Sequence, residues 1–305
     1  MTATVAIVGA TASGKSAVAL EVARALGGCE IVTVDSMQVY RGLDIGTAKP
    51  TPAEQAEVPH HLLDLVDVEE EFAVAPFVAA ARDALDGIGA RGHRALLVGG
   101  TGLYLRAIID GLDLPGRFPE TRAALAAEPD TASLHARLME LDPVAAARMT
   151  TSNRRRIERA LEVTVGSGRP FSSYGPGLDA YPPSPIAQVG LDVPVAELDR
   201  RIDARVAAML DGGLLTEARA LEGRSLSRTA ERALGYAELL EHLRGERSLE
   251  DAVAETVRRT RRLARRQLRW FRRDPRIRWA PPEAAVEVVI AALGSLRSRP
   301  IDHTS

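Results

Sequence analysis

The sequence predicts an α/β fold in which helices flank a parallel sheet. Short apolar runs such as Val5–Val8 recur along the first half of the chain, and segments with helical periodicity lie between them. Strands that alternate with helices are typical of βαβ units and therefore of parallel sheets. A chain of 305 residues with 46% hydrophobic content can bury one large domain together with an insertion or a second small domain.

The first apolar run is followed by the segment Gly9-Ala10-Thr11-Ala12-Ser13-Gly14-Lys15-Ser16, which fits the phosphate-loop pattern G-x-x-x-x-G-K-S/T. Gly9 and Gly14 let backbone N–H groups point inward around anionic oxygens. The helix that begins at Lys15 adds its positive end, Lys15 adds a point charge, and Ser16 offers a hydroxyl to Mg²⁺. The segment predicts a P-loop NTPase-like sheet and a polyphosphate ligand, which it does not identify.

Two later strands also end in polar residues, and the carboxyl ends of parallel strands meet at one edge of the sheet. The strand predicted at 30–34 ends at Asp35, whose carboxylate could hold Mg²⁺, accept a proton from a nucleophile or cap a helix. The strand predicted at 95–98 runs into Gly99–Gly102 and supplies no Walker-B acid. Thr101 in this turn either donates to a phosphate oxygen or only shapes the turn.

Helical periodicity predicts helices over residues 73–91 and 103–109. Beyond them the pattern changes, because prolines separate short helical pieces. We therefore expect a catalytic core of the P-loop type at 1–113 and 186–305, interrupted by a mainly helical insertion domain at 114–185 that binds the partner.

The C-terminal part is predicted to be helical after one more strand at 186–191. Helices are expected from Asp199, over 227–243 and, as the last element, from Ser248. The last helix ends in nine arginines among the sixteen residues 258–273. Like charges at i,i+4 spacing repel one another, so we expect this cluster to take its counter-charge from a phosphodiester backbone.

Charge is divided unevenly along the chain. The first 150 residues hold 12 Lys+Arg and 20 Asp+Glu, whereas the remainder holds 27 and 21, and the net charge is −2. The basic half indicates a large anionic partner, with solvated helix faces as the alternative.

The composition also bears on the compartment. The single cysteine, Cys29, allows no internal disulfide, which is typical of a reducing environment. The first apolar run ends at the glycine loop and is a strand rather than a signal peptide, and no run is long enough to cross a bilayer. We expect a cytoplasmic protein that makes no membrane contact and acts as a monomer.

Only two of the 39 basic residues are lysine, Lys15 and Lys49. Such a bias indicates that lysine is kept where a compact ammonium matters, which makes Lys49 a candidate near the glycine loop. Chance retention is the alternative. The adjacent His60 and His61 point to opposite sides of any regular element, so we expect structural roles for them and not a metal site.

Three classes of function fit these residues. A small-molecule kinase would use the loop and Asp35 as a base, and a nucleic-acid NTPase would use the loop and the arginines but lacks another Walker-B acid. A transferase with a polyphosphate leaving group accounts for the loop, the carboxylate and the arginines without ATP.

The sequence resembles the tRNA dimethylallyltransferases of the IPP transferase family, which prenylate the exocyclic amine of the adenosine just 3′ of the anticodon. Two departures from the family pattern are mild: Ser16 stands where threonine is frequent, and Arg266 where lysine is common. The matching stretches are Gly9–Ser16 (GATASGKS), Asp35–Tyr40 (DSMQVY), Asp44–Pro50 (DIGTAKP), Pro59–Leu62 (PHHL), Gly99–Tyr104 (GGTGLY), Glu120–Leu125, Arg156–Glu162 (RIERALE), Ala233–Glu238 (ALGYAE) and Arg265–Phe271 (RRQLRWF).

The resemblance implies that dimethylallyl diphosphate, not ATP, binds in the loop with Mg²⁺ as cofactor and Ser16 as its ligand. It implies catalytic roles for Asp35 as the base toward the adenine N6, for Thr101 near the same centre and for Arg122 beside the leaving group. The residues implied to bind the diphosphate are Gly9, Ala10, Thr11, Ala12, Ser13, Gly14, Lys15, Ser16 and Arg232.

The resemblance also implies that the tRNA anticodon stem-loop is the partner and that the reacting adenosine swings out of its stack. Alternatives are an adenylate isopentenyltransferase acting on a free nucleotide and a P-loop small-molecule kinase. The residues implied to bind tRNA are Asp35, Ser36, Met37, Gln38, Arg154, Arg155, Arg156, Arg159, Arg265, Arg266 and Arg269.

Overall fold

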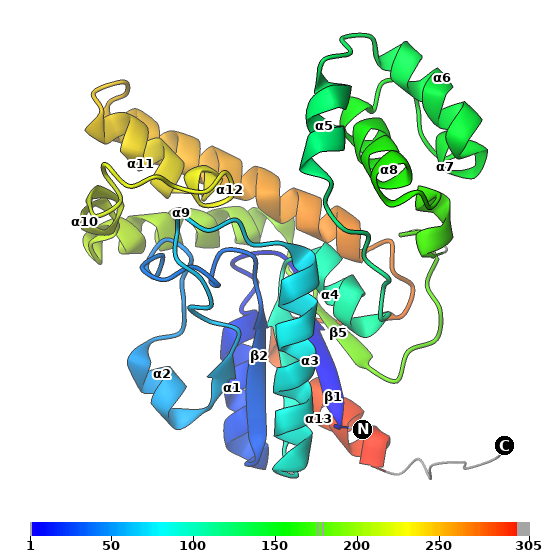
Figure 1. Ribbon diagram of the computed structural model, residues 1–305. Coiled ribbons are helices and arrows are strands. Elements are labelled where there is room, and N and C mark those ends of the chain that lie inside the picture. Colours follow the sequence, from blue (N-terminus) through cyan, green and yellow to red (C-terminus); the bar gives the residue numbers. More distant parts are fainter. Residues whose placement is uncertain (1, 176, 179, 298–305) are drawn as a thin grey trace, which may run out of the picture. The chain divides into compact units, whose positions relative to one another are not determined.

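The structure, a computed structural model, describes residues 2–175, 177–178 and 180–297 (Figure 1). Its described residues form a six-stranded sheet in the order β3-β2-β4-β1-β5-β6, and every neighbouring pair of strands is parallel. The predicted parallel sheet is therefore confirmed. The strands are β1 (Thr4–Val8), β2 (Cys29–Val34), β3 (His60–His61), β4 (Arg94–Gly99), β5 (Ala187–Leu191) and β6 (Ile277–Ala280).

The chain divides into two compact units, Met1–Ile109 with Pro183–Ser305, and Asp110–Pro182. The second unit falls in the stretch where an insertion was expected, at 114–185. The helices of the first unit are α1 (Lys15–Leu26), α2 (Pro52–Glu57), α3 (Val74–Ala90), α4 (Gly102–Ile109), α9 (Val195–Asp211), α10 (Leu214–Arg219), η2 (Ala230–Arg232), α11 (Tyr236–Leu243), α12 (Leu249–Phe271) and α13 (Pro282–Arg297).

Helices cover both faces of the sheet, so the central strands β1, β2 and β4 are buried along nearly their whole length. Val5 and Ile7 of β1 belong to a buried cluster with α1 and α13. Successive residues of a strand point to opposite faces, so the alternate positions of β1 face the other side. There α3 packs against β2 and β4, and its Phe77 contacts Tyr104 of α4 with ring centroids 4.7 Å apart.

The second unit is helical and has a core of its own. Leu134 and Leu138 of one helix are buried against Ile157 and Leu161 of another. None of the helices in the described part of the chain is long and apolar enough to cross a membrane. The elements of this unit are α5 (Pro119–Ala126), α6 (Thr131–Leu141), α7 (Pro143–Ala147), α8 (Arg154–Ser167) and η1 (Phe171–Tyr174).

Three predictions for the C-terminal part were wrong. The helix expected over 227–243 is interrupted. The short turn η2 ends at Arg232, and a separate helix, α11, begins after Gly235, whose positive φ of 88° favours glycine and ends the helical path. The helix from Ser248 is not the last element, since β6 and α13 follow it. The C-terminal part also contains a strand that was not predicted, β6. This strand has only four residues, which are too few to show a period-2 pattern in the sequence.

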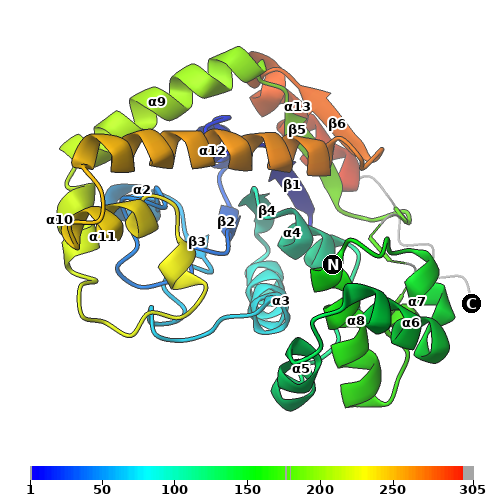
Figure 2. The same cartoon turned by 90° about the horizontal axis from the view of Figure 1, so that it is seen from above.

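The order β2-β4-β1 explains where the functional residues meet. These adjacent parallel strands end at Val34, Gly99 and Val8, and the segments that follow them emerge at one edge of the sheet. Helix α12 runs beside α9 across this edge, as both views show (Figures 1 and 2). The sheet therefore positions the glycine loop, Asp35 and the turn at Thr101 as neighbours.

A buried carboxylate ties β2 to its surroundings. Glu30, 2% exposed, accepts two hydrogen bonds from Arg91 at 2.8 and 2.7 Å and also bonds to His61 (2.6 Å) and His93 (2.8 Å). These donors, with Arg91 contributing most, lower the pKa of Glu30 from 4.5 to about 2 against the effect of burial. The two histidines of β3 turn to different sides: His61 contacts Glu30, whereas His60 bonds to the Val58 carbonyl at 2.7 Å.

We expect Glu30→Gln to destabilise the protein at neutral pH by on the order of 2–3 kcal/mol. Because the folded pKa lies below the ordinary value, the carboxylate stabilises the fold above about pH 4.5, and this contribution is lost as pH falls toward 2. The difference between wild type and variant should shrink over that range in urea unfolding followed by tryptophan fluorescence. Glu57→Gln, at an exposed pair with Arg24, is the control and should change stability little. A constant difference at all pH values would contradict the assignment.

Candidate active site

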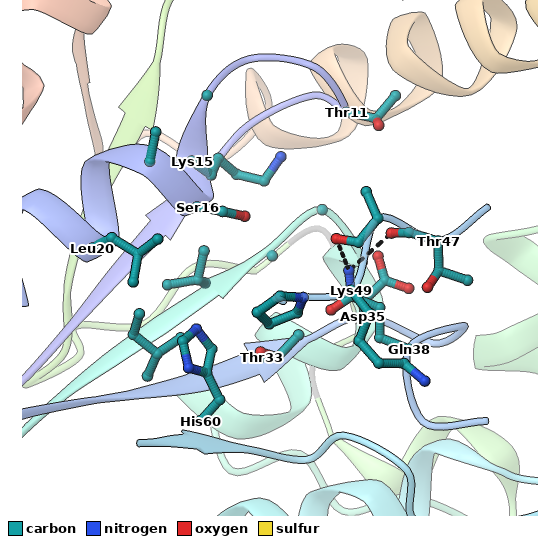
Figure 3. A pocket seen from close by; sticks show the side chains of 18 of the residues that line it. Thr11, Lys15, Ser16, Leu20, Thr33, Asp35, Gln38, Thr47, Lys49 and His60 are labelled. Carbon is teal, nitrogen blue, oxygen red and sulfur yellow. Dashed lines mark hydrogen bonds between the residues drawn. The ribbon is translucent and has the colours of Figure 1, made fainter. Parts of the chain in front are cut away.

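The glycine loop lies between β1 and α1, as predicted. Gly14 caps α1 with φ 96°, and the non-glycine Ala12 is also left-handed, at φ 63°. The Lys15 ammonium donates to the Ala10 carbonyl at 2.6 Å and so folds back over the loop. The loop thus presents the start of α1 and the hydroxyl of Ser16 to the space beside it (Figure 3).

That space is a cavity of about 270 Å³ at the carboxyl edge of the sheet. It is bounded by the glycine loop, the ends of β2 and β4, the segment 47–50, and single side chains of α9 and α12 (Figure 3). Residues predicted for the site that line it are Thr11, Ala12, Gly14, Lys15, Ser16, Asp35 and Gln38. The other lining residues are Ala17, Leu20, Ile31, Thr33, Thr47, Ala48, Lys49, Pro50, Glu54, His60, Val98, Gly99, Gly100, Arg205 and Gln267.

Three cations line this cavity: Lys49, which is paired with Asp44 and Asp64, and Lys15 and Arg205, which have no acid partner among the described residues. Burial lowers the pKa of Lys15 to about 8, helped by the charge of Arg205 and opposed by the Asp35 carboxylate. Burial also lowers the pKa of Arg205, again opposed by Asp35. Arg205 makes no hydrogen bond or ion pair among the described residues, so an anion entering the cavity would meet two cations that no carboxylate neutralises by contact.

Arg205 was not predicted from the sequence. It lies in α9 next to Val206 and three positions after Ile202, both buried in the contact with α12. An arginine beside the apolar stripe of a helix is a signal that it faces inward, and this pattern could have identified it.

The Asp35 carboxylate is half-buried and accepts a hydrogen bond from the Met37 N–H at 2.8 Å. Thr101 lies behind this turn, where its hydroxyl accepts a bond from the Ser36 N–H at 3.3 Å. Thr101 does not line the cavity. Its hydroxyl contacts the backbone of the turn that carries Asp35, on the side away from the cavity.

Gln267 of α12 joins the glycine loop to the end of β4. Its amide oxygen accepts from the Thr11 N–H at 2.8 Å, and its amide nitrogen donates to the Gly100 carbonyl at 3.0 Å. A helix 256 residues further along the chain therefore fixes the rim of the phosphate loop. Sequence reasoning gave Gln267 no role, because a glutamine among nine arginines carries no motif of its own.

A second, smaller cavity of about 120 Å³ adjoins the first and shares Thr11, Asp35, Thr47 and Arg205 with it. Its remaining lining is mostly apolar and comes from α9, α12 and the turn before α11. These residues are Met37, Gly46, Ile202, Val206, Met209, Leu214, Ala233, Leu234, Gly235, Thr256, Thr260 and Leu263.

One set of arginines, in α12 and at its C-terminal cap, is paired with acids. Arg261 pairs with Asp203 at 2.5 Å, Arg265 with Asp199 at 2.7 Å and the capping Arg272 with Asp192 at 2.7 Å, all on or just before α9. Arg259 pairs with Glu238 of α11, and Arg258 with Glu255 of α12 itself. The expectation that a phosphodiester backbone supplies the counter-charge therefore needs correction, since α9 supplies part of it. A second set is exposed and makes no ion pair within the described residues: Arg262, Arg266 and Arg269.

The predicted arginines of the second unit also differ from one another. Arg154 donates to the carbonyls of Glu128 and Pro129, and Arg159 to those of Pro115 and Gly116, so both hold their own unit together. The arginines that are exposed and have no partner within the described residues are Arg122, Arg155 and Arg156.

Arg232 in η2 is exposed and lines neither cavity in the described structure. Ser13 is buried, and its hydroxyl has no hydrogen-bond partner within the described residues. Gly9 and Ala10 are buried in the loop behind the lining residues. The roles expected of these four residues stay predictions. His60 lines the cavity but gathers no ligand set, since the described residues contain no group of three or more His, Cys, Asp or Glu suited to a metal.

The sheet order, the glycine loop and the cations around it define an α/β protein of the P-loop class. Within that class, the family model described as IPP transferase matches residues 38–274, and the one described as isopentenyl transferase matches residues 2–70. The chain belongs to the IPP transferase family.

Similar proteins agree with this assignment. A tRNA dimethylallyltransferase of Kineococcus radiotolerans is 52% identical, with 91% of this chain and 90% of the relative covered, and one of Streptomyces coelicolor is 48% identical with 97% and 96% covered. The solved tRNA isopentenylpyrophosphate transferase of Bacillus halodurans has a TM-score of 0.70 and 36% identity, covering 96% of this chain and 97% of that one. A eukaryotic dimethylallyltransferase solved acting on tRNA has a TM-score of 0.79 and 25% identity, covering 98% and 81%.

We expect Arg205→Gln to weaken the binding of inorganic diphosphate about 10- to 100-fold, because a charge-assisted hydrogen bond in a partly buried site is lost. Isothermal titration calorimetry in Mg²⁺-containing buffer measures this affinity. Arg200→Gln changes the same helix at a side chain that is 78% exposed and should leave the affinity unchanged. Equal weakening by both variants would mean that Arg205 acts only through the overall charge.

Proposed function

We propose that this chain transfers the dimethylallyl group of dimethylallyl diphosphate to N6 of the adenosine 3′ of the anticodon in tRNA, releasing diphosphate. The observation that carries the proposal is the junction of two cavities at Asp35: one is lined by a phosphate loop and by the cations Lys15 and Arg205, the other is mostly apolar. A phosphorylated ligand with a short hydrocarbon tail suits this pair, and relatives over nine-tenths of the chain bear the name tRNA dimethylallyltransferase.

The leaving group would lie in the larger cavity. As the allylic C–O bond breaks, negative charge develops on the diphosphate, and the loop N–H groups, Lys15 and Arg205 are already held where that charge appears. The hydroxyl of Ser16 and the carboxylate of Asp35 line the same cavity, and hard oxygen donors of this kind suit Mg²⁺. Mg²⁺ bound with the diphosphate would add positive charge at the leaving oxygens, with Ser16 as its protein ligand.

The five-carbon tail would enter the smaller cavity, whose wall is formed by side chains such as Ile202, Val206 and Leu263. Burial there would remove the tail from water and leave its first carbon near Asp35, one of the side chains that both cavities share. A short tail suits a cavity of about 120 Å³. This arrangement favours the allylic diphosphate over a nucleoside triphosphate as the ligand.

Asp35 would act as the general base. The adenine N6 forms a bond to the allylic carbon while that carbon loses its bond to the diphosphate oxygen, and the N6 proton passes to the Asp35 carboxylate. The hydrogen bond from the Met37 N–H orients the carboxylate, and Thr101 supports the turn from behind. Positioned base catalysis of this kind contributes about 10²–10⁴-fold.

The tRNA would be held by arginines that the protein leaves without partners. On α12 these are Arg262, Arg266 and Arg269, spaced at i, i+4 and i+7 and therefore on one face of the helix. In the second unit, Arg155 and Arg156 are likewise exposed and have no partner within the described residues. Contacts with the backbone would offset the cost of turning the adenosine out of its loop, which is about a few kcal/mol. A cytoplasmic location would give the enzyme access to its tRNA.

We expect Asp35→Asn to lower kcat for prenyl transfer about 10²- to 10⁴-fold while tRNA affinity stays within about threefold, since asparagine keeps the oxygen that accepts from Met37 but cannot take up the proton. Mass spectrometry of an anticodon stem-loop RNA incubated with enzyme, Mg²⁺ and dimethylallyl diphosphate detects the added five-carbon group. Asp67→Asn, at a surface pair with Arg41, is the control. No product with the wild-type enzyme, together with phosphorylation of a small alcohol or nucleoside from ATP, would favour a kinase instead.

We expect Arg266→Ala and Arg269→Ala each to weaken tRNA binding and to reduce the slope of log affinity against log salt by about one. Arg265→Ala should have a smaller effect on that slope, because Asp199 already neutralises this side chain. Filter binding across a salt series measures both quantities. A wild-type affinity that is independent of salt would argue for a free nucleotide as the acceptor.

A further inference from the structure

The loop from Asp44 to Pro50 forms one wall of the larger cavity, and its conformation depends on contacts outside itself. Thr47, Ala48, Lys49 and Pro50 line the cavity. Ala48 is left-handed at φ 49°, as is Asp64 at φ 53° in the segment that faces the loop. Left-handed residues other than glycine persist only where their surroundings hold them. The contacts that hold this wall therefore bear on the reaction.

Lys49 is the central contact. Its side chain is 4% exposed, and its ammonium donates to the Tyr40 carbonyl at 2.9 Å, to the Asp64 carboxylate at 2.6 Å and to the Asp44 carboxylate. An ammonium carries three N–H donors, so all of them are used. The three acceptors belong to three separate stretches of chain: the end of the Asp35 turn, the start of the 44–50 loop and the segment at Asp64. Lys49 joins these stretches at one point.

Gln38 links this junction to the residues predicted to face the adenine. Its side-chain amide nitrogen donates to the carbonyls of Thr47 and Ala48 at 2.9 and 3.1 Å, and its backbone carbonyl accepts from the Asp64 N–H at 3.2 Å. Because the nitrogen is committed to the loop, the orientation of the amide is fixed. The side-chain amide oxygen of Gln38 is buried and has no hydrogen-bond partner within the described residues. A shift of the loop would therefore turn Gln38, and with it the segment that carries Asp35.

A second anchor holds the loop from the other side. The Glu217 carboxylate of α10 accepts bonds from the N–H groups of Asp44, Ile45 and Gly46 at 2.9 to 3.2 Å. The buried Tyr236 hydroxyl accepts from the Gly46 N–H at 3.0 Å and donates to Glu217. A Cβ atom at Gly46 would lie 2.5 Å from the Tyr236 ring, so the loop and the ring approach as closely as glycine allows.

We propose that Lys49 is a positioning residue for prenyl transfer: by fixing the 44–50 loop it orients Gln38 and the Asp35 turn, and only a compact ammonium can do so. This inference rests on the proposed function. Three acceptors around one nitrogen fit the tetrahedral donors of lysine, whereas the guanidinium of arginine is planar, longer and has its donors in a fork. The requirement accounts for lysine at this position in a chain whose basic residues are otherwise arginine, apart from Lys15 in the phosphate loop.

The test separates geometry from charge. We expect Lys49→Arg, which keeps the charge, to lower kcat about 10- to 100-fold while KM for dimethylallyl diphosphate stays within about threefold, because misplacement of reacting groups affects the chemical step and the phosphate-loop contacts remain. Lys49→Met should lower kcat at least as much. Arg41→Met is the matched control: it removes a cation that contacts Asp67 and the Leu65 carbonyl in the neighbouring segment, outside the cavity. It should retain wild-type kcat.

A readout without substrate distinguishes this inference from the proposed function. Amide hydrogen exchange over residues 44–50 should rise in both Lys49 variants and stay unchanged in Arg41→Met, whatever reaction the enzyme performs. Tyr236→Phe removes one hydroxyl from the second anchor with little change in volume; it should raise exchange over the same residues and lower kcat about 3- to 10-fold. If a Lys49 variant fails to fold, Tyr236→Phe still tests whether fixing the 44–50 loop affects the reaction.

Wild-type kcat in Lys49→Arg would overturn the proposal, because charge alone would then suffice. So would an equal loss in Arg41→Met, or unchanged exchange and kcat in Tyr236→Phe. Absence of prenyl transfer by the wild-type enzyme would instead remove the proposed function and leave the exchange result to decide whether Lys49 fixes the loop.

Discussion

Two cations that share a cavity with no carboxylate bonded to them are the constraint on which the rest of this structure depends. Burial lowers the pKa of both Lys15 and Arg205, and the charge of Arg205 lowers the pKa of Lys15 further. Such a pair persists only if rigid elements hold it. Lys15 is held by the glycine loop at the end of a buried strand, and Arg205 by a helix whose apolar side packs against α12. In the proposed function, the entering diphosphate would supply the counter-charge that both cations lack.

Helix α12 serves both that constraint and the outer surface. On one side its ion pairs with Asp199 and Asp203 fix α9, and Gln267 reaches the rim of the phosphate loop. On another side Arg262, Arg266 and Arg269 are exposed to solvent. In the proposed function, these outer arginines would bind the partner, and the inner contacts, which are made within the protein, would keep the cavity in place. One amphipathic helix would then serve both substrate positioning and partner binding.

Much of the fold and part of the site followed from local sequence. The glycine loop and Asp35 are recognisable because each directly follows an apolar strand, and the parallel order then brings them together. Gln267 and Glu217 were missed because their roles come from contacts with residues more than 150 positions away, which no local pattern encodes. Arg205 lies beside the apolar stripe of α9, a signal that the sequence contained but that was not used. The break at Gly235 was missed for a related reason, since helical periodicity continues across a residue whose backbone turns the other way.

The scarcity of lysine has a consequence for the chemistry of the folded chain toward electrophiles. Lys49 is enclosed and its nitrogen is surrounded by three acceptors, so an acylating reagent has little access to it. Lys15 differs, because at a pKa of about 8 a substantial share of its side chain is the free amine at mildly alkaline pH. Of the two lysines, amine-directed probes will therefore favour Lys15, which lines the cavity, and a ligand in the cavity will shield it.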